Sequence, residues 1–335
     1  MTAVTRRKPT MTDLANAAGV SLMTVSNCFK QPHKVHADTR KKVMDAAAAV
    51  GYVPNLIASS LASGSSRMVA ALVPSLRNSN FATTLQGLGD YLHSRGYELL
   101  LAVAEDPARE EIVLRNLLGR QPGGIVLTGG EHSKESIALI RHAGVPVVET
   151  WIAPKPGLDM AVGFSLFDAA RDIAQLLVKK GLRHVGWAGF EATSDRHLQR
   201  QRGFQQAMKD AGLRSDLLFL APENAGFAGG RLALDALVRK EPKLQGLCCV
   251  TDVLAAGALF ECMRRGWSVP EQFSVAGYGD FEIAAEVPPG LTTVKTNGAA
   301  IGRAAGEMLV QKIETGRIDS PVRQVPYEIV FRHSL

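Results

Sequence analysis

The segment from Leu22 to Asn27 carries side chains that can bind the bases of duplex DNA. Thr24 and Ser26 have hydroxyls that can bond phosphates or base edges, and the amide of Asn27 can pair bidentately with adenine. Leu22 and Met23 can meet thymine methyl groups or sugar edges. The alternative is that Thr24 is an ordinary surface residue and Met23 a core residue. The DNA-binding interpretation requires a helix that presents these side chains to a groove.

Helix-capping residues around this segment predict a helix-turn-helix. Thr10 can cap one helix with Asp13 at its third position, and Gly19 permits the left-handed turn that ends it. Ser21 can cap a second helix over residues 22–29. Two helices joined by a short turn that contains glycine place the second helix in the major groove.

A third helix over residues 38–50, ending at Gly51, completes a small helical domain. Its apolar side chains recur at helical spacing and can pack against those of the first two helices. The residues expected in this core are Leu14, Ala18, Val20, Val25, Phe29, Val43, Ala46, Ala47 and Val50. We therefore expect an all-α DNA-binding headpiece over residues 1–54.

The excess positive charge of the chain lies in this N-terminal part. The 335 residues carry a formal net charge of +6. Residues 1–67 hold nine Lys and Arg against three Asp, so they account for the whole excess and the remainder is neutral. Because this segment also has helical pattern and caps, a folded module that binds a polyanion is favoured over a solvated basic tail.

Other classes of site are not indicated. The four cysteines, Cys28, Cys248, Cys249 and Cys262, lack the spacing of metal ligands, so we expect buried free thiols, no metal and a reducing compartment. Dinucleotide-binding glycine motifs, P-loops and nucleophile elbows are absent from the sequence, so neither a cofactor nor an enzyme is expected. The sequence also lacks a secretory signal and a membrane-length apolar run, which predicts a cytoplasmic protein.

Strand-like and helix-like segments alternate from residue 68 onward, which predicts an α/β core of parallel sheets with helices on both faces. The expected strands cover residues 68–73, 98–104, 124–128, 146–150, 184–189, 217–221, 246–250 and 273–278. Amphipathic helical stretches include residues 166–180, 199–211 and 254–265. There are too many strands for one small sheet, so we expect two lobes.

A ligand in such a fold binds beyond the carboxyl ends of the strands, here in the cleft between the lobes. Residues that end the expected strands or follow them closely enough to reach a small molecule are Ser75, Asn78, Phe81, Thr128 and Glu149.

The headpiece and the core are joined by a short segment, residues 55–67. Pro54 interrupts the chain, Asn55 can cap a short helix over residues 56–63, and a Gly/Ser linker follows. Leu61 is a lone large apolar residue on this helix. It could insert between base steps in the minor groove or dock onto the core, and the pattern alone leaves both readings open.

The stretch TDLANAAGVSLMTVSNCFKQPHKVHADTRKKVMDAAAAVGYVPNLIASSLASG resembles the headpiece and hinge of the lactose/galactose-repressor family, and the similarity continues through the core. The DNA-binding residues expected from the motif and the resemblance are Thr12, Leu22, Met23, Thr24, Ser26, Asn27, Asn55, Ala58 and Leu61. Asn27 stands where the family usually has Arg, and Leu56 where a basic residue is frequent. The operator sequence is therefore left open.

The resemblance also implies a core like that of periplasmic sugar-binding proteins, with two Rossmann-like lobes crossed by three strands. The first lobe would take residues 68–160 and 292–318, and the second residues 161–291 and 319–335. A dimer on a pseudo-palindromic operator is expected from the half-site geometry of such a headpiece.

Three further effector-binding residues follow from the resemblance. Arg200 matches the arginine that clamps the ligand, Asp252 belongs to an Asn-Asp pair, and Asp280 to a Gly-Tyr-Asp-Asp run. Here Thr251 replaces the Asn, and Gly279 replaces an Asp that commonly bonds sugar hydroxyls. Keeping Arg200 while losing that carboxylate favours an anion in the pocket.

The stretches PVVETWIAPKPGLDMAVGFSLFDAAR and LFECMRRGWSVP resemble gluconate-operon repressors. The resulting hypothesis is a homodimeric repressor of a carbohydrate or sugar-acid operon, with operator DNA and a gluconate-like effector as partners and no membrane contact. A neutral sugar or a purine is the alternative effector. A sugar-binding transport protein is the alternative class, but it would have no use for the cationic headpiece.

Overall fold

The computed structural model describes residues 7–54, 66–153, 155, 157–191, 194–222 and 224–335. The chain divides into two compact units, Met1–Ser66 and Arg67–Leu335. No helix in the described part of the chain is both long enough and apolar enough to cross a membrane.

Within residues 7–54, the first unit folds into three α-helices, α1 (Met11–Ala18), α2 (Leu22–Lys30) and α3 (Ala37–Val50). Thr10 and Asp13 form the expected capping box at the start of α1, and Gly19 ends this helix in the left-handed conformation. The predicted core is confirmed, and Ala15 and Cys28 join it as buried residues. A short 3-10 turn, Pro32–Lys34, links α2 to α3 and was not predicted.

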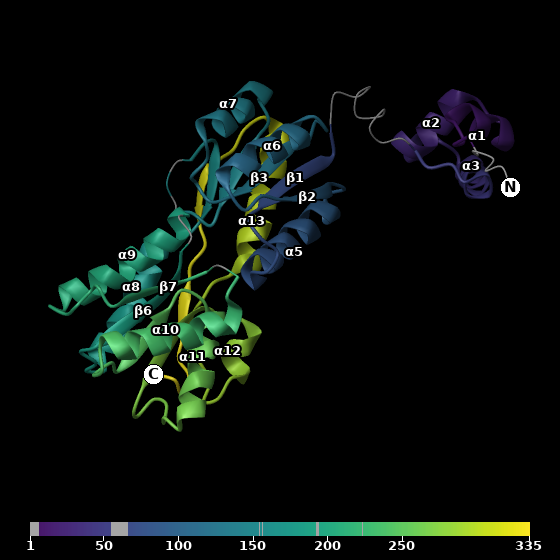
Figure 1. The fold of residues 1–335 in the computed structure, drawn as a ribbon. Helices are drawn as coiled ribbons and strands as arrows, with labels where there is room; N and C mark the ends of the chain where they lie inside the picture. The colour runs from purple at the N-terminus through teal and green to yellow at the C-terminus, as the bar shows by residue number, and fades with distance from the viewer. Residues whose placement is uncertain (1–6, 55–65, 154, 156, 192–193, 223) are drawn as a thin grey trace, which may run out of the picture. The chain divides into compact units, whose positions relative to one another are not determined.

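The first sheet of the second unit is parallel throughout, in the order β11-β5-β4-β3-β1-β2. Its strands are β1 (Met68–Val73), β2 (Glu98–Val103), β3 (Gly124–Thr128), β4 (Val147–Thr150), β5 (Met160–Gly163) and β11 (Val322–Gln324). The helices of this lobe are α5 (Ser79–Ser94), α6 (Pro107–Leu118), α7 (Lys134–Ala143) and α13 (Gly298–Thr315). Figure 1 shows α13, from the C-terminal part of the chain, lying beside α5.

The second sheet has the order β12-β10-β9-β8-β6-β7, and only the β10–β12 pair is antiparallel. Its strands are β6 (Val185–Phe190), β7 (Leu218–Ala221), β8 (Gly246–Cys249), β9 (Ser274–Gly279), β10 (Thr292–Lys295) and β12 (Glu328–Val330). The helices of this lobe are α8 (Leu166–Lys179), α9 (Asp195–Asp210), α10 (Gly226–Lys240), α11 (Asp252–Arg265) and α12 (Glu282–Glu286).

The eight expected strands are all present, and the four that were not expected decide the lobe boundaries. Because β5 belongs to the first sheet, the first lobe extends to Gly163 rather than to residue 160. Residues 322–324 form β11 and also belong to the first lobe. β10 pairs with β9, so residues 292–295 belong to the second lobe and not to the first. These strands have three or four residues each, too few for a periodic pattern, so only their hydrogen-bonded neighbours reveal which sheet they join.

Candidate DNA-binding surface and effector cleft

The N-terminal turn of α2 presents two large apolar side chains to solvent. Leu22 is 47% exposed and Met23 is 70% exposed, so the interpretation of Met23 as a core residue is wrong. The hydroxyl of Ser21 caps the helix by accepting from the backbone N–H of Thr24, and the two hydroxyls are 2.9 Å apart. Thr24 is therefore part of the helix cap as well as a candidate for DNA contact.

The described headpiece also carries polar and cationic side chains. Ser26 and Asn27 are half-buried on α2, and Thr12 is exposed on α1. The exposed basic residues of the described headpiece from α2 onward are Lys30, Lys34, Arg40, Lys41 and Lys42. Such a surface can bind phosphates while the start of α2 reads base edges. The predicted hinge residues Asn55, Ala58 and Leu61 lie outside the described residues.

The second unit contains a buried arginine at the position expected for the effector clamp. Arg200 is 8% exposed on α9. Its Nη1 donates to the carbonyl of Val250 at 2.9 Å, its Nε donates to the carbonyl of Arg196 at 3.1 Å, and its guanidinium lies over the ring of Tyr278. Burial lowers the pKa of this guanidinium. Among the described residues no carboxylate forms an ion pair with Arg200, so its charge is left without a counter-ion.

The two predicted acidic residues of this lobe bond to the protein itself. Asp252 is fully buried, where it accepts from the Thr293 hydroxyl at 2.5 Å and the Phe281 backbone N–H at 2.7 Å. Burial raises the pKa of its carboxyl to about 6, although these hydrogen bonds act against the shift. Asp280 forms an ion pair with Arg332 at 2.7 Å. Effector contacts from both residues stay predictions.

The glycine at position 279 has a structural reason. Gly279 has a φ of 132°, which L side chains rarely adopt. A β carbon at this position would also lie 2.5 Å from the ring of Phe281. Phe281 thus occupies the space that an Asp side chain would need, and this chain cannot restore the carboxylate without moving that ring.

Glu149, the acidic residue expected in the first lobe, belongs to a buried cluster with His132 and Glu110. Nδ1 of His132 lies 3.0 Å from Glu110 Oε1, and Nε2 makes a longer contact of 3.5 Å with Glu149 Oε1. Glu149 also accepts from the Leu158 backbone N–H at 2.5 Å. Burial favours the neutral imidazole, but the hydrogen bonds and negative charges of the two glutamates outweigh it and raise the pKa of His132 to about 9.

The remaining predicted residues of the first lobe lie at the end of β3 and in the segment and helix that follow β1. The Ser75 hydroxyl accepts from the Arg77 backbone N–H at 3.1 Å, and the Asn78 side chain caps α5. Phe81 is buried against the edge of the Trp151 ring. Thr128 ends β3, as expected.

The first turn of α9 joins the two lobes. Arg196 Nη1 donates to the carbonyl of Thr128 at 3.1 Å, and its guanidinium lies over the ring of Phe81. The backbone N–H of Asp195 donates to Glu131 at 3.1 Å. Phe81, Thr128 and Arg200 are therefore brought to one region, where the carboxyl ends of β1 and β3 face α9.

Comparisons with known proteins agree with this geometry. Residues 10–55 match the family described as bacterial regulatory proteins, lacI family, and residues 174–335 match a periplasmic binding protein-like domain. The chain is 33% identical to the HTH-type transcriptional regulator GntR of Escherichia coli K12 over 92% of its own length and 93% of the relative's. It is 34% identical to GntR of Pseudomonas aeruginosa over 98% and 96% of the two chains. The chain belongs to the LacI family.

A solved structure supports the same assignment. The crystal structure of a LacI family transcriptional regulator from Silicibacter pomeroyi matches with a TM-score of 0.90 and 32% identity, covering 97% of this chain and 99% of that one. This LacI-family protein is a DNA-binding transcriptional regulator, and its relatives are regulators rather than enzymes. The predicted family and fold class are confirmed.

Sequence reasoning missed three residues that contact the predicted effector residues or α9 in this LacI-family protein: Glu131, His132 and Arg196. The predicted helix begins at residue 199, whereas α9 begins at Asp195. Its first turn, which carries Arg196, was therefore omitted. The available signal was Ser194-Asp195, a common helix start, together with a basic residue one turn before Arg200. No local pattern marked His132, because its partners are distant in sequence.

Proposed function

We propose that this LacI-family regulator represses a sugar-acid catabolic operon in the cytoplasm and that a gluconate-like acid is its effector. The observation that carries the proposal is Arg200, a buried guanidinium bonded to backbone carbonyls with no carboxylate paired to it among the described residues. A buried charge is costly unless an opposite charge accompanies it. The carboxylate of an aldonate supplies that charge in a bidentate geometry.

The similarity to GntR regulators supports the same class of effector, and the blocked carboxylate position at Gly279 removes one source of repulsion. Effector binding would reorient the two lobes across the contacts of Arg196 with the first lobe. A coupling of about 1–3 kcal/mol between effector and operator sites would suffice for a useful switch.

The test is a calorimetric titration of the full chain with gluconate, related aldonates and neutral sugars, combined with a gel shift on the promoter of the adjacent operon. We expect aldonates to bind and to release the operator fragment. Binding of neutral sugars or purines alone would assign the alternative effector. A chain that fails to bind any neighbouring duplex in a salt-sensitive manner would contradict the operator assignment.

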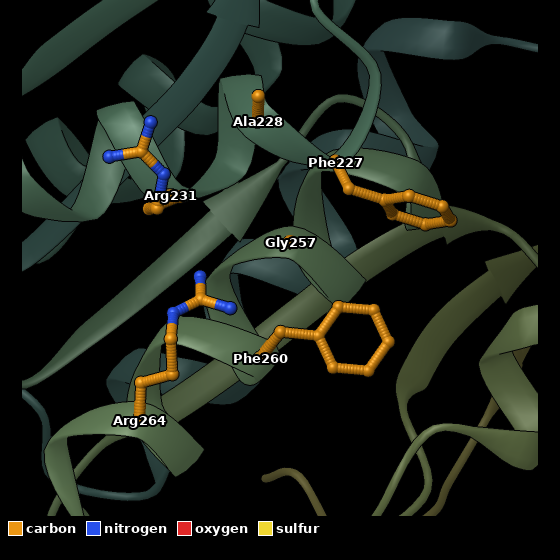
Figure 2. Close-up of a pocket in the computed structure, with 6 residues that line it drawn as sticks. All are labelled: Phe227, Ala228, Arg231, Gly257, Phe260 and Arg264. Atoms are coloured by element: carbon orange, nitrogen blue, oxygen red, sulfur yellow. The ribbon is translucent and has the colours of Figure 1, made fainter.

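We propose further that the protein acts as a homodimer, with a surface of the second lobe in the interface. Phe227 on α10 is 47% exposed, and its ring contacts the ring of Phe260 on α11 edge to face. Figure 2 shows both rings beside Arg231 and Arg264 in a shallow pocket. Each arginine has an acidic partner on its own helix, Asp235 or Glu261.

The charges of Arg231 and Arg264 are thus partly balanced within the chain, because Arg265 shares both carboxylates. A two-fold contact brings identical patches together, so partly balanced cations near the exposed Phe227 ring suit it better than bare ones would. Phe227→Ser should shift the sedimentation coefficient toward that of a monomer, whereas Ile112→Ser, at an exposed apolar residue of α6, serves as the comparison. An unchanged dimer in the Phe227 variant would remove this face from the interface.

A further inference from the structure

A second pocket lies in the second lobe, between α9 and the ends of strands β6, β7 and β8. Its volume is about 190 Å³, and its lining includes Trp187, Gly189, His197, Gln201, Leu220 and Val250. It can therefore take a short hydroxylated chain but not a large ring system.

One wall of the pocket carries a buried donor without an acceptor. Trp187 is 1% exposed, and its indole N–H has no hydrogen-bond partner among the described residues. Its ring is fixed against Phe204, with ring centroids 5.4 Å apart. Buried donors are almost always satisfied in folded proteins, and an unsatisfied one costs free energy. The indole N–H is thus a fixed donor, and an acceptor supplied by a ligand would remove this energetic cost.

The glycine at position 189 leaves the space next to this donor free of a side chain. Gly189 follows Trp187 by two residues on β6, so the two face the same side of the sheet. A β carbon at 189 would lie 2.6 Å from the indole nitrogen and 3.1 Å from Leu220. Any larger residue would close the approach to the N–H.

The pocket adjoins the arginine clamp. On α9, His197 lies one turn before Arg200 and Gln201 directly follows it, and both line the pocket. Val250 also lines the pocket, and its carbonyl accepts a hydrogen bond from Arg200. Burial, with Arg200 and Arg196 adding to the effect, lowers the pKa of His197 to about 2, so its imidazole is neutral. The exposed carboxylate of Glu191 also lines the pocket. Neutral donors and acceptors beside an acid suit hydroxyls and disfavour a second anionic group.

We propose that this pocket is the subsite for the hydroxylated end of an acid whose carboxylate binds Arg200, with the Trp187 indole N–H donating to one of its hydroxyl oxygens. The proposal rests on the proposed function, because it places the same effector. It predicts that affinity depends on chain length, since only longer aldonates can reach from the arginine into the pocket.

The experiment is a calorimetric titration of the full chain with glycerate, erythronate and gluconate, in the wild type and in Trp187→Phe. The substitution keeps an aromatic ring against Phe204 and removes only the donor. We expect gluconate to bind about fivefold more weakly to the variant, the usual effect of one hydrogen bond, and glycerate to bind equally to both. Trp267→Phe, at a tryptophan outside the pocket, is the matched control and should change nothing.

Gln201→Ala, on the opposite wall, is the second variant and should show the same selective loss. It keeps the test informative if Trp187→Phe fails to fold, which circular dichroism and operator binding would reveal. If the wild type binds aldonates but the pocket variants keep its full chain-length dependence, the subsite is wrong while the proposed function stands. If the wild type binds no aldonate, the proposed function itself fails.

Discussion

At the scale of the residue, burial decides how the charge of the Arg200 guanidinium can be used. Its guanidinium donates to the carbonyls of Val250 and Arg196 and lies over Tyr278, and these contacts hold it without neutralising its charge. Water and dissolved counter-ions would screen the charge of an exposed arginine. The buried one has no carboxylate paired with it in the described part of the chain, which suits it to bind an anion as proposed above.

Replacing this group by lysine tests whether the fork geometry matters. Arg200→Lys should weaken gluconate binding at least about tenfold, because an ammonium cannot bind a carboxylate bidentately while keeping both backbone contacts. Operator binding without effector should stay unchanged. Calorimetry and gel shifts measure the two effects, and Arg202→Lys, exposed on the same helix, is the control. Equal losses in both variants would contradict the clamp.

The buried cluster of His132, Glu110 and Glu149 predicts a pH-dependent stability. The pKa of His132 is about 9 in the folded protein against 6.5 for the free side chain. A raised pKa means that the native state holds its proton more tightly. The stabilisation is therefore complete below about pH 6.5 and is lost as the pH rises through about 9, for a total of about 3 kcal/mol.

His132→Gln should flatten this dependence. Urea denaturation at pH 6.5, 7.5 and 9 measures it, and the wild type should lose stability across the series while the variant loses less. His142→Gln, at an exposed histidine of α7, should behave as the wild type does. A wild type as stable at pH 9 as at pH 6.5 would show that the cluster does not hold its proton in this way.

At the scale of the element, different residues at the start of α1 are expected to serve stability and DNA recognition. Thr10 stabilises α1 through the capping box: its hydroxyl accepts from the Asp13 backbone N–H at 3.2 Å, while its own backbone N–H donates to the Asp13 carboxylate. Thr12, two residues later, is exposed on the same helix, and the structure assigns its side chain no hydrogen bond to a described residue. Substitutions of the two threonines should therefore have different effects on stability and on operator binding.

Thr10→Ala should destabilise the headpiece by about 1 kcal/mol, because it leaves the start of α1 uncapped. Thr12→Ala should leave stability unchanged and weaken operator binding. Amide hydrogen exchange over residues 11–18 reports the first effect and a gel shift the second. If Thr12→Ala also loosens α1, the predicted DNA contact cannot be separated from folding.

At the scale of the whole core, the first turn of α9 contacts the first lobe, and one of these contacts comes from a charged side chain. Arg196 contacts Thr128 and Phe81 of the first lobe, and Asp195 contacts Glu131. A lobe rotation that opens the cleft must break these contacts. These polar contacts add to the apolar core cluster that the two lobes share.

Arg196→Ala should shift the core toward an open arrangement. We expect faster amide hydrogen exchange over residues 128–131 without effector, because the Thr128 carbonyl loses its donor and the loop loses the adjacent helix. Arg202→Ala, exposed on the same helix, should leave that exchange unchanged. Protection of this loop that is equal in both variants would show that Arg196 does not hold the lobes together.

The sequence by itself determined the helices of the headpiece, eight of the strands and the position of Arg200. Caps, glycine turns and apolar periodicity are local, so they can be read along the chain without knowing the fold. The charge excess of residues 1–67 likewise needed no structure.

Only the tertiary structure decided which sheet takes the short strands β5, β10, β11 and β12, because their partners come from distant parts of the chain. It also decided that Asp252 and Asp280 bond within the protein and that His132 contacts two glutamates. Likewise, only the structure shows that the Trp187 indole N–H has no acceptor among the residues it describes. Burial, hydrogen-bond satisfaction and pKa depend on neighbours brought together by folding, and a linear pattern carries no record of those neighbours.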